Sequence, residues 1–225
     1  MKNIFRFLAK HKLAILAAIC CLVVQAYCDL ALPTYTSDVL NVGLQQGGIA
    51  DGVMDTVRAD SLETLELFMT DADTQTVEQA YTQPNASGVR TLRDDADRET
   101  LNNILRKPEA TVYQMRSSDK TKGAPEQIKA AVAAGAMTKE QLISQMDEAF
   151  SKMGDMTDTF LTEIAVNYVS AEYQAQGIDL NQVRNAYLFA VGGKMLLMAV
   201  IMAIAAILVG LIASVTSSKV GRDLR

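Results

Sequence analysis

Residues 195–215 read MLLMAVIMAIAAILVGLIASV, and this stretch decides the fold. It is the centre of 24 consecutive uncharged residues between Lys194 and Lys219. About 20 apolar residues in a helix are enough to cross the hydrocarbon core of a bilayer. A helix of this length in the core of a water-soluble protein would carry a polar face, and this one carries none. The stretch therefore predicts a transmembrane helix.

A second apolar segment lies near the start of the chain. Residues 13–32, LAILAAICCLVVQAYCDLAL, contain one charge, Asp29, and one amide, Gln25. A cleaved signal peptide is the alternative to a membrane helix, because a basic start and a short apolar run are typical of both. No A-x-A triplet follows the run, and the residues before Cys28 make a poor lipoprotein site. We therefore favour a retained transmembrane helix.

The charges around the two segments predict their orientation. Four basic residues and no acidic residue precede the first segment (Lys2, Arg6, Lys10, Lys12). Three basic residues and one acidic residue, Asp223, follow the second segment (Lys219, Arg222, Arg225). Residues 33–193 carry 13 Lys and Arg against 24 Asp and Glu, a net charge of −11. The positive-inside rule then places both termini in the cytoplasm and roughly 150 residues outside. We expect a multi-pass membrane protein.

Composition and motifs exclude several functions. The net charge of −5 excludes a basic nucleic-acid-binding protein, so we expect no nucleic-acid partner. The three cysteines all lie within residues 20–28, and His11 is the only histidine, so neither a disulfide framework nor a histidine-rich metal site is expected. The sequence contains no G-x-x-x-x-G-K-[ST] and no G-x-S-x-G. We expect no catalytic, cofactor-binding or metal-binding residue on this chain.

Both apolar segments carry a row of small or weakly polar residues at spacings of 4, 3, 4 and 3. Small residues at such spacing let helix backbones approach closely in lipid. The rows therefore predict a packing seam on each helix, although alanine-rich helices also give such rows by chance. The residues are Ala14, Ala18, Cys21, Gln25 and Cys28 in the first helix, and Ala199, Ala203, Ala206, Gly210 and Ala213 in the second.

The segment between the two helices shows helical signals and no sustained strand pattern. Asp60-Ser61 can begin one helix, and residues 84–88 form a turn. Residues 92–105 predict a second helix, ended by Pro108 and preceded by an acidic run typical of a solvated helix start (Asp94, Asp95, Asp97, Glu99). A polar and basic loop is expected over residues 117–123.

Further signals follow towards the second apolar segment. Pro125 suits the first turn of a short helix ending at Gly135, and Thr138 with Gln141 makes a capping box. An apolar face over residues 160–169 predicts a helix that stops at Gly177, and a last helix begins near Asp179 and continues into the second apolar segment. The fold class expected is an all-α membrane protein, with two transmembrane helices flanking a helical extracellular domain. Its parts are residues 1–34 (cytoplasmic lead and first membrane helix), 35–186 (extracellular insertion), 187–218 (second membrane helix) and 219–225 (start of a cytoplasmic arm).

The two ends of the chain resemble the first two membrane helices of bacterial ATP-binding-cassette (ABC) exporters. In that family a proline near the outer end of the first helix precedes a D-[VI]-[LIV]-[ND]-x-G pattern, matched here by Pro33 and by Asp38, Val39, Leu40, Asn41 and Gly43. An R-x-L-R element ends the family's second helix and leads to the coupling helix, and Arg222, Leu224 and Arg225 match it. The resemblance covers residues 1–48 and 187–225, about 90 positions.

The resemblance implies the amino-terminal part of the transmembrane domain of an ATP-driven exporter. Such a chain lines part of the substrate pathway and needs the remaining membrane helices, nucleotide-binding domains that hold ATP and Mg²⁺, and a second transporter half, identical or different. Most family members have a short loop where this chain has about 140 residues, and this chain stops after two helices. It would therefore be a fragment of the transporter, and alone it would not hydrolyse ATP.

Two alternatives remain open at the level of sequence. A chemoreceptor or sensor kinase also places a helical outer domain of about 150 residues between two membrane helices, although the residues GRDLR at the end of the chain are unlike a receptor linker. A two-helix accessory protein is the other alternative. The transported substrate and the role of the outer domain do not follow from the sequence.

Overall fold

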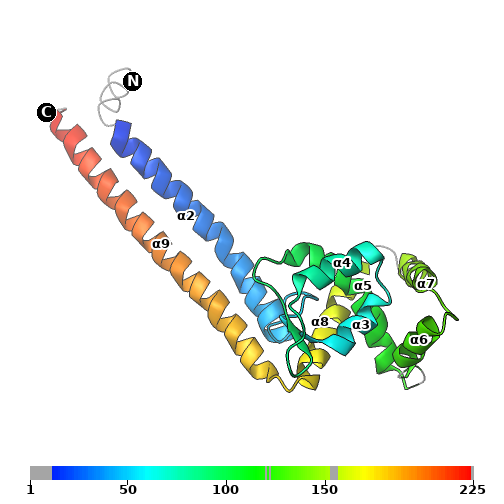
Figure 1. The fold of residues 1–225 in the computed structure, drawn as a ribbon. Helices are drawn as coiled ribbons and strands as arrows, with labels where there is room; N and C mark the ends of the chain where they lie inside the picture. Colours follow the sequence, from blue (N-terminus) through cyan, green and yellow to red (C-terminus); the bar gives the residue numbers. More distant parts are fainter. Residues whose placement is uncertain (1–11, 120, 122, 153–156, 224–225) are drawn as a thin grey trace. The chain divides into compact units, whose positions relative to one another are not determined.

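A computed structural model of the chain describes residues 12–119, 121, 123–152 and 157–223. These residues are mostly helical, as predicted, and form two units. One unit comprises Met1–Gln45 and Asn185–Arg225 and contains two long helices; the other is the helical domain Gln46–Arg184. Figure 1 identifies the helices of both units by label.

The first long helix, α2, spans Lys12–Asp38 and continues as a π-helical segment, η2, over Val39–Gln45. It is therefore longer than the predicted first membrane segment. Pro33 lies inside α2 and has no N–H, so the carbonyl of Asp29 loses its usual helical partner there. The helix nonetheless continues to Asp38.

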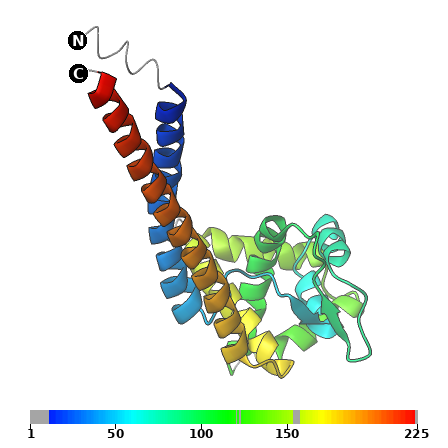
Figure 2. The same cartoon turned by 90° about the vertical axis from the view of Figure 1, so that its left-hand side faces the viewer.

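The second long helix, α9, spans Leu180–Asp223. The backbone N–H of Asn181 donates to Asp179 Oδ1 at 2.9 Å, a contact typical of a helix start, and the predicted continuous helix from this point is confirmed. Its 44 residues give a length of about 66 Å at about 1.5 Å per residue. Figure 2 shows α9 as one long ribbon, and Figure 1 shows α2 along its length.

The surfaces of α2, η2 and α9 are apolar. Within the described part of the chain, the large hydrophobic side chains that are exposed all lie on these helices, including Leu13 (83% exposed), Leu30 (77%) and Phe189 (82%). Lys12–Gln45 and Leu180–Lys219 are both long and apolar enough to cross a membrane. Because such surfaces are costly in water, a bilayer is the medium that suits them.

The helical domain contains six helices and a small sheet in its described residues. Helix α5 (Arg98–Ser117) packs along α8 (Thr157–Ala175), and the apolar core surrounds this pair. The strands β1 (Thr56–Arg58) and β2 (Val89–Thr91) are antiparallel and were not predicted. The remaining helices are α3 (Ala59–Glu66), α4 (Asp71–Ala80), α6 (Ala124–Ala133) and α7 (Lys139–Ser151).

Two sequence predictions for this domain were wrong. The helix expected over residues 92–105 begins at Arg98, because Asp97 caps it with bonds to the N–H groups of Glu99 and Thr100. It also continues through Pro108, which is buried, so packing outweighs the one backbone hydrogen bond that proline removes. The start expected at Asp60-Ser61 lies instead at Arg58, which makes no side-chain cap.

Other local predictions are confirmed. Thr138 and Gln141 form both bonds of the capping box of α7. Pro125 lies in the first turn of α6, and glycines with positive φ follow α6 (Gly135, 71°) and α8 (Gly177, 77°). Asn85 closes the predicted turn by accepting from the N–H groups of Ser87 and Val89. Residues 120 and 122 of the predicted loop are outside the described residues.

The two ends of the helical domain lie against each other. Gly48 has a φ of 86°, and a Cβ placed on it would lie 2.7 Å from the Cα of Arg184. Arg184 is the last residue of this domain. The chain therefore comes into the domain and leaves it at neighbouring points, and a glycine is required where its two ends meet.

We predict that Gly48→Ala destabilises the helical domain more than Gly47→Ala does. Gly47 has a similar φ of 67°, but a Cβ there meets nothing within 4 Å. Gly47→Ala should therefore cost only the left-handed backbone penalty, about 1 kcal/mol, whereas Gly48→Ala should cost about 1–3 kcal/mol more because backbone has to move. Thermal unfolding of the full chain, followed by near-ultraviolet circular dichroism of its tyrosines, measures both. Equal losses would contradict the close approach.

Candidate functional site

The predicted seam residues of the first helix form its least exposed face. Ala14, Ala18, Cys21 and Gln25 are half-buried and Cys28 is buried, while most residues between them are exposed. The Sγ of Cys28 lies 3.9 Å from the Sδ of Met198 in α9. The small side chains of α2 therefore leave room for the larger side chains of α9.

The predicted row of the second helix lies elsewhere. Ala199 is half-buried, but Ala203, Ala206, Gly210 and Ala213 are exposed. The covered row of α9 is displaced by about one position and consists of Met195, Met198, Met202, Ala205, Val209 and Ile212. It keeps the spacing of 3 and 4 with mainly large side chains. Ala203, Ala206, Gly210 and Ala213 thus lie outside this covered row, and their role as a seam toward other helices stays a prediction.

The glycine of the exporter-like pattern lies where the two long helices come close. Gly43 in η2 is buried, and a Cβ on it would lie 2.5 Å from the Cδ2 of Leu188 in α9. Within the same pattern, Asn41 Nδ2 donates to Ser37 Oγ at 3.1 Å. The last residue of the pattern is therefore the glycine that leaves space for the Leu188 side chain of α9.

The predicted start of the coupling arm is only partly described. Arg222 is exposed in the last turn of α9. Leu224 and Arg225 are outside the described residues, as are Lys2, Arg6, Lys10 and His11. Lys12, the first described residue, is exposed.

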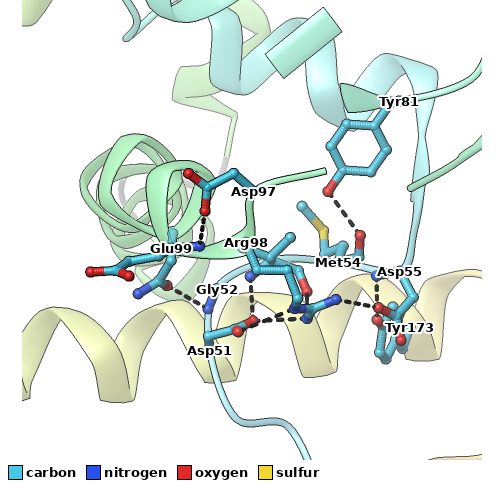
Figure 3. A network of polar contacts seen from close by, with 11 residues as sticks. Asp51, Gly52, Met54, Asp55, Tyr81, Asp97, Arg98, Glu99 and Tyr173 are labelled. Atoms are coloured by element: carbon cyan, nitrogen blue, oxygen red, sulfur yellow. Dashed lines mark hydrogen bonds and ion pairs between the residues drawn. The ribbon is translucent and has the colours of Figure 1, made fainter. Parts of the chain in front are cut away.

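In the helical domain, Arg98 holds the segment 51–55 by a polar network (Figure 3). Its Nη2 is 3.0 Å from Asp51 Oδ1 and 2.8 Å from the carbonyl oxygen of Val53, and its Nη1 is 2.7 Å from Asp55 Oδ1. The N–H of Gly52 donates to Asn102 Oδ1 at 2.9 Å. Arg98 follows the helix cap at Asp97, so the start of α5 positions it.

Two buried tyrosines extend this network (Figure 3). The hydroxyl of Tyr81 donates to the carbonyl oxygen of Met54 at 2.8 Å, and the hydroxyl of Tyr173 accepts from the N–H of Asp55 at 2.8 Å. Burial raises the pKa of Tyr173 to about 12 and raises that of Tyr81 as well. Both hydroxyls therefore stay neutral, and they fix an irregular segment by hydrogen bonds to its backbone.

Glu109 is a carboxylic acid inside the core of this domain. It is fully buried on α5, and neither carboxyl oxygen has a hydrogen-bond partner among the described residues. Gly52 leaves the space for its Oε2, beside Ala165 and Asn102. Burial, and secondarily the charge of Asp51, raises the pKa of Glu109 well above its ordinary value. The protonated, neutral form is therefore favoured at this position.

A second buried carboxylate is fully paired. Glu172 on α8 accepts hydrogen bonds from the Nε and Nη2 of Arg58, at 2.9 and 2.8 Å, and from the Arg58 backbone N–H. Ser61 Oγ and Gln176 Nε2 also donate to it. Burial alone would raise the pKa of Glu172, but these bonds outweigh it and hold the pKa below its ordinary value. This ion pair fixes β1 to α8.

Two of the cavities between described residues of the helical domain differ in size and lining. The larger, about 470 Å³, is lined mainly by apolar side chains of α5, α6 and α7, including Met115, Met146 and Phe150. The smaller, about 260 Å³, lies between α5 and α8 and contains Arg58 and Arg116. Over the described ranges, no group of three or more His, Cys, Asp or Glu residues is placed to hold a metal ion.

The sequence pointed to few of these groups. Arg98 follows a recognisable capping aspartate, so its place at a helix start could have been inferred. Glu109 stands in a polar stretch, RKPEA, and only the tertiary packing of α5 against α8 shows that it is buried. Arg58 and Glu172 are 114 residues apart in the sequence, and no local pattern connects them.

The described residues thus define a largely helical protein with two helices long and apolar enough to span a membrane. No protein-family model, curated protein or solved structure matches the chain.

We predict that Met198→Cys can be cross-linked to Cys28, in a chain where Cys20 and Cys21 are replaced by alanine. The Cys28 and Met198 sulfur atoms are in contact, so a short bis-methanethiosulfonate reagent should bridge the two cysteines and make a reducible change in gel mobility. Ala203→Cys in the same background is the matched control, because Ala203 is exposed on another face of α9. Efficient bridging from position 203 and none from position 198 would contradict the packing.

We also predict that Glu109→Gln removes a pH dependence of stability. The folded chain raises the pKa of Glu109 above its ordinary value of 4.5, so folding binds a proton. The contribution of Glu109 to the free energy of unfolding should therefore be fully present below pH 4.5 and should fall as pH rises towards the folded pKa, by up to about 1.4 kcal/mol per pH unit.

Urea unfolding of the full chain at several pH values measures this effect. The difference between the wild-type and Glu109→Gln curves isolates Glu109, because the other groups titrate in both proteins. Glu148→Gln, at an exposed residue of α7, is the matched control variant. Parallel profiles for wild type and Glu109→Gln would refute the prediction.

Proposed function

We propose that the chain is the amino-terminal part of the transmembrane domain of an ABC-type exporter. In this proposal α2 with η2 and α9 are its first two membrane helices, and Gln46–Arg184 is an extracellular domain inserted between them. The proposal places both termini in the cytoplasm of a bacterial cell. Three features of the molecule support it.

Gly43 is the observation that carries the proposal. The exporter-like pattern from Asp38 to Gly43 was noted from sequence alone, and its glycine is the buried residue that meets Leu188 of α9. The glycine of this pattern therefore has a packing role in this chain, because a Cβ at position 43 would displace the Leu188 side chain of α9.

The length of α9 is the second support. About 30 Å of helix crosses the hydrocarbon core, whereas α9 extends for about 66 Å without interruption. The helix also continues past the uncharged stretch, which ends before Lys219, to Asp223. Continuous helices that project beyond the membrane suit a transporter, since they can transmit motion to nucleotide-binding domains.

The third support is the way in which the helical domain is attached. Its ends meet at Gly48 and Arg184, and a domain with adjacent ends can replace a short loop without separating the helices that flank it. Exporters of this class join their first two helices on the outer side. The helical domain can therefore be inserted between the first two membrane helices of the exporter fold while these helices stay paired.

The proposed role follows from this placement. The two helices would form part of the wall of the substrate pathway, and the arm beginning near Arg222 would connect α9 to a coupling helix. Dimerisation of ATP-loaded nucleotide-binding domains would switch the helix bundle between inward-facing and outward-facing states, as rigid bodies. ATP and Mg²⁺ would bind those domains, and a second half, identical or different, would complete the pathway.

We predict that the coding sequence continues beyond Arg225 with four more apolar segments of about 20 residues, followed by G-x-x-x-x-G-K-[ST]. Genomic sequencing of the region tests this directly. Replacing the lysine of that motif by alanine should abolish ATP hydrolysis by the full protein and leave its membrane insertion intact. A heptad-rich linker with a kinase or methyl-accepting domain would establish the receptor alternative, and a stop codon directly after Arg225 would support a two-helix accessory protein.

A further inference from the structure

The smaller cavity of the helical domain differs from the rest of the acidic outer segment. It lies between α5 and α8, has a volume of about 260 Å³, and includes two guanidinium groups, Arg58 and Arg116. Its volume is slightly below that of pockets for drug-sized ligands, so it suits a small molecule. Residues 33–193 carry a net charge of −11, which makes a cationic pocket in this domain notable.

The single carboxylate of this pocket is already neutralised. Glu172 accepts two side-chain hydrogen bonds from Arg58, and three further donors bind it. The charges of Arg58 and Glu172 therefore cancel within the protein. A ligand that enters the pocket meets no free negative charge from its lining.

Arg116 supplies the uncompensated charge. Within the described ranges no carboxylate lies at ion-pair distance from it, and its Cζ lies 5.9 Å from the centroid of the Tyr168 ring. Stacking on an aromatic ring orients a guanidinium and leaves the N–H groups at its edge available. The pocket therefore carries a net charge of about +1, from the guanidinium of Arg116.

The remaining lining residues determine which kind of group can be attached to the anionic group of a ligand. The rings of Tyr113 and Tyr168 and the methyl groups of Ala171 and Ala175 are apolar surfaces. Tyr168 itself is buried, and its hydroxyl is not exposed to the pocket. The pocket thus combines two guanidinium groups, one of which is paired with Glu172, with apolar walls.

We propose that this pocket binds a small monoanionic carboxylate with a flat apolar body. The carboxylate would pair with the Arg116 guanidinium, and the body would lie against the tyrosine rings and the alanine methyl groups. A single net positive charge matches a carboxylate better than a phosphate dianion. The helical domain is then a ligand-binding module, whatever the class of the complete protein.

The test uses the full chain in dodecyl maltoside with 4-fluorobenzoate as the probe, followed by ¹⁹F NMR line broadening. The uncharged 4-fluorobenzamide has almost the same shape and is the matched control ligand, and a titration of detergent alone gives the background. A charge-assisted bidentate pair is worth roughly 1.5–3 kcal/mol, so the acid should bind at least about tenfold more tightly than the amide. Equal affinity for the two, or no binding of the acid, would overturn the proposal.

Protein variants locate the site. Arg116→Gln should weaken 4-fluorobenzoate binding at least about tenfold, whereas Arg93→Gln, which removes an exposed charge outside the pocket, should leave binding unchanged. Ala171→Phe should abolish binding by filling the cavity while keeping Arg116, and it decides the matter should Arg116→Gln fail to fold by circular dichroism. Undiminished binding to folded Arg116→Gln or to Ala171→Phe would refute the assignment.

Discussion

The structure depends on the close approach of two chain segments at the boundary of the helical domain. Gly48 lies against the backbone of Arg184, and no side chain fits between them. Because the two ends of the domain meet there, a domain of well over a hundred residues can be attached without dictating the separation of the helices on either side. Gly43 plays the equivalent part within the long-helix unit, where it admits Leu188. At both positions the absence of a side chain permits the close contact.

The two units are stabilised by different means. The long helices form their backbone hydrogen bonds within each helix and present mainly apolar side chains. Both properties suit a lipid environment. The helical domain has a conventional core, with α5 against α8, and its irregular segment 51–55 is tied to that core by Arg98 and two tyrosines. It also contains an unpaired acid, Glu109, whose burial costs stability. The pocket beside the Arg58–Glu172 pair is the proposed ligand site, and it is separate from the interactions that stabilise the core.

Sequence reasoning succeeded where the signal was local and failed where tertiary contacts decided. The apolar lengths, the capping box at Thr138 and the glycines after α6 and α8 each have a local cause, and all were predictable. The passage of α5 through Pro108 and the burial of Glu109 depend on α8, more than 40 residues later, so no local pattern reports them. The row of small residues in α2 lies on the less exposed face of that helix, whereas the covered row of α9 consists mainly of larger residues such as Met198, which contacts Cys28.

In the proposed topology, both long helices cross a membrane and the helical domain lies on its outer side. Labelling of single cysteines with a membrane-impermeant maleimide tests it most directly, in bacterial cells producing the chain with Cys20, Cys21 and Cys28 replaced by alanine. Ser87→Cys, in an exposed turn of the helical domain, should react in intact cells, whereas Ser218→Cys, near the end of α9, should react only after permeabilisation. Three results would contradict this topology. The first is the opposite labelling pattern, and the second is reaction at both positions in intact cells. The third is loss of an amino-terminal tag by cleavage.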